Sequence, residues 1–156
     1  MVPMLAHAGV FAISVDRKKD GAGQMKGDIE KATSQNWVGE IKIENLTFKP
    51  SAEVELRYII FVKRQELGQK TGMDQVDQVK GTIKVGSLKS HEKASFSTSE
   101  VTLRQQQLDP HYYYKSGGIQ KAADTVLGVW VKVFSGENEL AEYVNPSTLK
   151  SKNKWE

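Results

Sequence analysis

The stretch that decides the fold is Ala52–Gln65, which reads AEVELRYIIFVKRQ. Apolar side chains recur at every second position within it, which is the period of a β-strand with one buried face. These inward positions are Val54, Leu56, Tyr58, Ile60 and Val62. Ile59 and Phe61 interrupt the charged opposite face, so both faces are apolar at the centre of the strand. This pattern predicts a central strand whose second face is partly covered.

A second strand of the same kind is predicted at Thr125–Phe134, where Trp130 and Phe134 lie opposite a regular series of Leu and Val. Weaker alternating patterns predict further strands in five other segments: Val10–Arg17, Trp37–Phe48, Val79–Val85, Ala94–Leu103 and Glu139–Val144. Two polar stretches separate some of these strands. Asp20–Ser34 is predicted to be a long exposed connection with a short helical turn near Asp28–Ala32. Arg104–Asp124 is predicted to be a second long connection, of a length that is often functional.

About seven strands joined by turns, with little helix, predict an all-β protein. The two central strands favour an immunoglobulin-like or fibronectin-like antiparallel β-sandwich, with a β-barrel as the alternative. The chain shows no internal repeat and is expected to form a single domain over residues 9–156. Residues 1–8 are interpreted as an N-terminal arm or the remnant of an export signal, because Ala6-His7-Ala8 has the Ala-x-Ala form of a cleavage site.

Composition excludes several classes of function. The 156 residues include no cysteine, which excludes disulfides, thiol nucleophiles and cysteine-ligated metals. The net charge is only +3, and the one dense basic cluster is Lys150, Lys152 and Lys154, interpreted as a fraying tail; nucleic-acid binding is therefore not expected. No apolar run approaches the roughly 20 residues of a membrane span.

The order of the strand patterns resembles small exported immunoglobulin-like β-sandwich proteins of Verrucomicrobia-type bacteria. The segments that carry the resemblance are FAISVDRK (Phe11–Lys18), IKIENLTF (Ile41–Phe48), ELRYIIF (Glu55–Phe61), Gly86–Lys89 and Gly128–Lys150. The resemblance covers most of residues 9–155. It implies an exported protein of the periplasm, outer membrane or cell surface, since some of these proteins accompany pilus-like genes. It transfers no functional residue, because its motifs are strand patterns.

No catalytic constellation is evident. The three histidines, His7, His91 and His111, lie in an arm, a turn and a long connection, without the spacing of paired metal ligands. No G-x-S-x-G motif is present. We therefore predict a protein that is not an enzyme, with no catalytic residue, no metal site and no cofactor.

Two candidate binding features remain. Tyr112, Tyr113 and Tyr114 combine rigid apolar rings with hydroxyl groups and suit protein or sugar surfaces, unless they pack down to close the sandwich. The second candidate is an apolar patch for a partner subunit, unless the chain's own long loops cover it; its residues are Ile59, Phe61, Trp130 and Phe134.

These observations predict a non-enzymatic binding or assembly module of the bacterial envelope or of a pilus-like surface structure. Its partner would be a protein at the envelope or a second copy of the chain. The alternative is a carbohydrate-binding module that uses the tyrosine-rich loop 111–118 to bind a glycan. The assembly hypothesis requires an open sheet edge. The carbohydrate-binding hypothesis requires exposed tyrosine rings beside hydrogen-bonding side chains.

Overall fold

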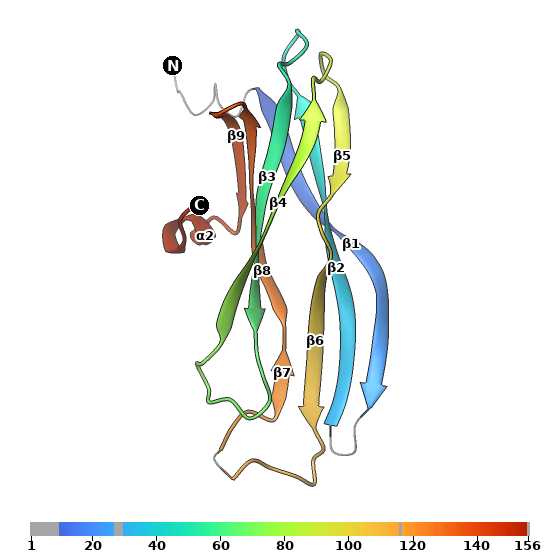
Figure 1. Cartoon of the computed structure of the whole chain (residues 1–156), viewed down its shortest axis with the longest axis vertical. Coiled ribbons are helices and arrows are strands. Elements are labelled where there is room, and N and C mark those ends of the chain that lie inside the picture. Colours follow the sequence, from blue (N-terminus) through green and yellow to red (C-terminus); the bar gives the residue numbers. More distant parts are fainter. Residues whose placement is uncertain (1–9, 27–29, 116, 156) are drawn as a thin grey trace.

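Two antiparallel sheets stack face to face to form an elongated sandwich (Figure 1). The structure is a computed structural model that describes residues 10–26, 30–115 and 117–155. The first sheet contains the strands β1 (Phe11–Lys26), β2 (Glu30–Asn45), β5 (Lys93–Ser97), β6 (Val101–Leu108) and β7 (Lys121–Ala123). The second contains β3 (Val54–Arg64), β4 (Gln75–Gly86), β8 (Thr125–Ser135) and β9 (Asn138–Asn145). A short helix, α2 (Thr148–Lys152), follows β9.

The strand order confirms the predicted all-β sandwich. The first sheet runs β1-β2-β6-β7, with β5 paired to the part of β2 beyond β6, and the second runs β4-β3-β8-β9. The chain crosses between the sheets after β2, after β4 and after β7. Such crossings are typical of the Greek-key connections of immunoglobulin-like and fibronectin-like domains. The described strands form two separate sheets instead of the alternative barrel.

The predicted connection at Asp20–Ser34 is wrong over its described residues. β1 and β2 continue through it as one long hairpin, paired from Phe11 with Asn45 to Lys26 with Lys31. β2 lies between β1 and β6, so backbone pairing on both sides holds a polar, glycine-containing stretch in strand conformation. Residues 27–29 of the predicted helical turn lie outside the described residues, and the rest of that turn is strand.

The second predicted connection is also shorter than expected. β6 continues to Leu108, and β7 pairs with it through Gln105, Gln106 and Gln107. These glutamines have little strand propensity, but β2 and β7 flank them on both sides and satisfy their backbone groups. The true loop is residues 109–120.

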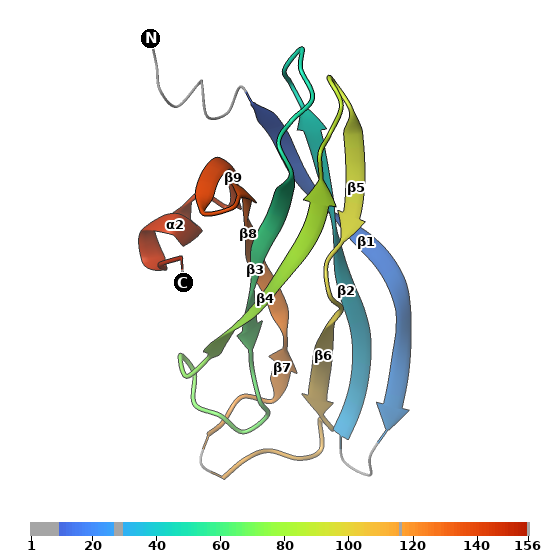
Figure 2. The same cartoon turned by 45° about the horizontal axis from the view of Figure 1, so that its top comes forward.

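The core lies between the sheets, where β3 and β8 contribute inward side chains such as Leu56, Ile60 and Val131 that are almost inaccessible to solvent. A second, smaller apolar cluster lies on the opposite face of β3 and β8, beneath Leu149 of α2. The two clusters explain why both central strands are apolar on both sides. Figure 2 shows α2 and the end of the chain lying beside β9, where a fraying tail had been expected.

No helix among the described residues combines the length and the hydropathy that crossing a membrane requires.

Candidate binding surface at the loop end

Two loops meet at one end of the sandwich, the β3–β4 loop (residues 65–74) and the β6–β7 loop (residues 109–120) (Figure 1). The backbone N–H of Gly68 donates to the carbonyl of Ile119 over 2.9 Å, and the N–H of Ile119 donates to the carbonyl of Gln69 over 2.9 Å. A Cβ atom at Gly118 would collide with the backbone of Gly68. This close approach requires glycine and joins the two loops into one unit.

The three tyrosines of the β6–β7 loop do not act alike. Tyr112 is 51% exposed and Tyr113 is 74% exposed, whereas Tyr114 is half buried with its ring against Gly68. The side chain of Asp109 accepts a hydrogen bond from the N–H of His111 over 2.9 Å and fixes the turn that carries Tyr112. The structure therefore presents two of the predicted tyrosines and uses the third to pack the loops together.

The β3–β4 side of this end adds apolar surface that the sequence reading missed. Met73 is 64% exposed and Val76, near the start of β4, is 51% exposed. We refer to Met73, Val76, Tyr112 and Tyr113, which are exposed at the same end of the sandwich, as the loop-end patch. These four are the majority of the seven large apolar side chains that are exposed among the described residues. Met73 and Val76 sit in a polar, turn-like stretch of sequence, which offers no periodic signal to identify them.

A buried carboxylate anchors the loops to the sheets. The side chain of Asp124 is only 1% exposed and accepts hydrogen bonds from Arg64 Nη1 (2.9 Å), the Arg104 N–H (3.0 Å) and the Gln65 N–H (3.4 Å). Burial of Arg64 would by itself lower its pKa, but the hydrogen bonds to Asp77 and Asp124 outweigh that effect and raise the pKa. The guanidinium therefore stays charged and acts as a structural clamp.

The predicted second patch is covered by the chain itself. Its four side chains, Ile59, Phe61, Trp130 and Phe134, are all buried. The cover is the C-terminal segment and not one of the long loops. Leu149 is buried in the cluster, and the ring of Trp155 lies 5.4 Å from that of Trp130 and 6.4 Å from that of Phe134, measured between centroids.

An ion network holds this cover in place. Glu142 on β9 accepts hydrogen bonds from Lys150 Nζ (2.6 Å) and from the indole N–H of Trp130 (3.1 Å), while Lys132 Nζ lies 3.6 Å from it. Partial burial would raise the pKa of Glu142, but the hydrogen bonds from Lys150 and Trp130 outweigh it and lower the pKa. The same contact with Glu142 raises the pKa of Lys150.

Acid is therefore expected to loosen the C-terminal segment. Because the folded-state pKa of Glu142 is lowered, its stabilisation is present at neutral pH and is lost as the pH falls through that pKa, below the ordinary value of about 4.3. Tryptophan emission in a Trp37→Phe background should shift to the red over this pH range. A Glu142→Gln variant should lack that transition, and an identical transition in the variant would contradict the role of Glu142.

The described residues do not assemble a metal site, since no group of three or more His, Asp or Glu side chains lies close enough together. His111 Nδ1 lies 2.9 Å from Asp109 Oδ1, but both side chains belong to the same exposed turn. Arg64, Glu142 and Lys150, whose pKa values are shifted, each have a structural ion partner.

No protein-family model and no curated protein matches the sequence. Among solved structures, the fold is similar to part of beta-glucuronidase 2 from Bacteroides uniformis, with 16% identity and a TM-score of 0.32. That match covers 88% of this chain but only 13% of the glucuronidase chain. A protein from Akkermansia muciniphila is also similar, with 10% identity, a TM-score of 0.36, and coverage of 94% of this chain and 78% of the other. Similarity at this level defines no family for the chain.

Proposed function

We propose that this β-sandwich is a non-enzymatic binding module that engages a protein partner through the loop-end patch. The observation that carries the proposal is the exposure of Met73, Tyr112 and Tyr113 on two loops that backbone hydrogen bonds join, and of Val76 at the start of β4. Tyr and Met are enriched in protein interfaces, and a preformed surface avoids part of the entropy cost of binding. The exposed Met73 and Val76 at this end favour protein side chains over a sugar ring.

An open sheet edge supports the same proposal. β4 pairs with β3 on one side only in the described sheets, and its 12 residues contain no proline. Its free N–H and C=O groups are a template for strand addition, although the outward Lys80 and Lys84 restrict which strands can approach. The start of this edge lies beside Met73 and includes Val76, so one partner can contact the edge and the patch together.

We place this module at the bacterial envelope or in a pilus-like surface structure, with a protein of that compartment or a second copy of the chain as its partner. The support is the resemblance to exported β-sandwich proteins and the Ala-x-Ala motif at Ala6–Ala8. The fold hosts many functions, so the partner must be identified at the surface.

The test is capture from a bacterial envelope extract with the purified domain as bait. Wild-type protein should enrich a specific partner, and the double variant Tyr112→Ser, Tyr113→Ser should reduce that enrichment at least tenfold. Phe48→Ser is the matched control, because Phe48 is an exposed aromatic residue in the β2–β3 loop at the opposite end. Sedimentation velocity of the bait alone tests self-assembly. Equal capture by the double variant would exclude the loop-end patch as the binding surface.

A further inference from the structure

Along β2 and β6, the sheet face that carries Trp37 and Val101 changes from apolar to polar toward the loop end. Trp37 and its partner Val101 belong to the core. The next pair on this face is Gln35 with Leu103, and the one after it is Thr33 with Gln105. Gln107 follows on the same face of β6, because side chains two positions apart share a face. Gln35 is half buried and Gln105 and Gln107 are exposed, so this face of the sheet is polar and open to solvent at the loop end.

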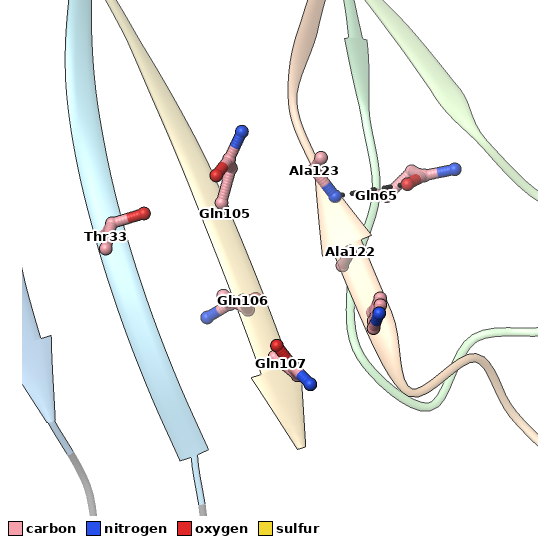
Figure 3. Close-up of a pocket in the computed structure, with 8 residues that line it drawn as sticks. Thr33, Gln65, Gln105, Gln106, Gln107, Ala122 and Ala123 are labelled. Carbon is pink, nitrogen blue, oxygen red and sulfur yellow. Dashed lines mark hydrogen bonds between the residues drawn. The ribbon is translucent and has the colours of Figure 1, made fainter. Parts of the chain in front are cut away.

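These side chains border two overlapping hollows. The first holds about 470 Å³, and its lining includes Gln65, Gln105, Gln106, Gln107 and Ala122. Figure 3 shows Gln105, Gln106 and Gln107 on β6 next to the short strand β7, with Gln65, just after β3, on the other side of β7. The second hollow shares Thr33 and Gln105 with the first and reaches Trp37. A volume of this size suits a small ligand or one unit of a larger one. We call the joined hollows the polar cleft.

The glutamines of the cleft are available for a ligand. Within the described chain, Gln35, Gln105 and Gln107 make no side-chain hydrogen bond. Gln65 differs, because its amide oxygen accepts from the Ala123 N–H (3.1 Å) and its amide nitrogen donates to Asp74 (3.0 Å).

The chemistry of the cleft selects among ligands. An amide side chain both donates and accepts hydrogen bonds, as a sugar hydroxyl does. Among the side chains that the structure describes, Lys121 is the one charged group lining the first hollow; of the two lining the second, Arg17 and Asp124, the latter is engaged by Arg64. These described side chains offer neither a cationic cluster for phosphate nor free carboxylates for a cation.

A peptide strand fits the cleft less well than a sugar does. The strands at its floor already pair with each other, Gln105 with Ala123 and Gln107 with Lys121, and so offer few free backbone groups for a ladder. Recognition must then come from side chains. We propose that the polar cleft binds a neutral sugar unit of an oligosaccharide through the amides of Gln35, Gln105 and Gln107.

The experiment is an NMR titration of the ¹⁵N-labelled full chain, following the side-chain amide signals of the glutamines. The probes are maltotriose, cellotriose, galactobiose and N-acetyllactosamine, with tetra-alanine as the peptide comparator. At least one saccharide should produce saturable shifts at Gln105 and Gln107 and none at Gln78, which is exposed on β4. The double variant Gln105→Leu, Gln107→Leu should weaken binding at least tenfold without lowering Tm, and Gln78→Leu should leave binding unchanged.

If the leucine variant fails to fold, Gln105→Asn, Gln107→Asn shortens both amides and should still weaken binding. The proposal is overturned if no neutral saccharide shifts the cleft glutamines, if tetra-alanine shifts them equally, or if the variants bind as wild type does. This site is separate from the loop-end patch. Loss of saccharide binding in the glutamine variant with intact protein capture would therefore distinguish the two proposals.

Discussion

Replacing Asp124 by alanine is expected to lower the free energy of unfolding by about 3 kcal/mol, the lower end for breaking a buried ion pair. The variant removes the acceptor of two backbone N–H groups, from Gln65 and Arg104, and the partner of Arg64. Arg64 is partly exposed, so water can solvate it in the variant, which keeps the loss from being larger. Urea unfolding at constant m-value should measure the change.

Asp77→Ala is the matched control, because Asp77 contacts the same guanidinium over 3.1 Å but is half exposed. An exposed pair of this kind contributes about 1 kcal/mol or less. Asp124→Asn should fall between the two, since the amide oxygen can still accept from the backbone. If Asp124→Ala costs no more than Asp77→Ala, the buried carboxylate does not anchor the loop end.

Period-two alternation was sufficient to predict the two central strands. The stretch Ala52–Gln65 contains β3, and Thr125–Phe134 lies within β8. The alternating apolar residues of both strands lie in the core between the sheets. Their second apolar faces also have a structural meaning, because the cluster beneath Leu149 covers them. The pattern succeeds here because burial on both sides forces apolar residues onto both faces.

Polar strands could not be predicted in this way. The glycine-containing half of the β1–β2 hairpin and the glutamines of β6 carry no alternation, and neighbouring strands specify their conformation. Strand propensity depends strongly on such tertiary context. The polar cleft could not be predicted for the same reason, because it lies where the polar ends of β2 and β6 extend together beyond the apolar core.

The candidate site was only partly visible in the sequence. Tyr112, Tyr113 and Tyr114 are identical in type, and only the approach of Gly68 decides that Tyr114 packs inward. Asp124 could not be singled out, because its partners come from β3 and β6, far away in the chain. Long-range pairing, not composition, makes the loop end a rigid surface.

The second large effect is expected from ending the chain at Asn145, which removes α2 and Trp155. Truncation should lower the free energy of unfolding by about 3 to 5 kcal/mol, because Leu149 is buried and Trp155 contacts Trp130 and Phe134. It also uncovers Ile59, Phe61 and Trp130. The truncated domain should bind a hydrophobic dye and self-associate in sedimentation velocity, whereas the full chain should do neither through this face.

Two point-mutant pairs separate apolar cover from charge. Leu149→Ala with Trp155→Ala should reproduce most of the loss of stability, because it removes the side chains that pack on the sheet. Lys150→Ala with Lys152→Ala should cost no more than about 1 kcal/mol, because the ion pair of Lys150 with Glu142 is partly exposed and Lys152 is exposed. If the lysine pair costs as much as the apolar pair, charge and not burial holds the segment. If neither pair matters, β3 and β8 need no cover, and their second apolar face would have to serve the partner surface first predicted from the sequence.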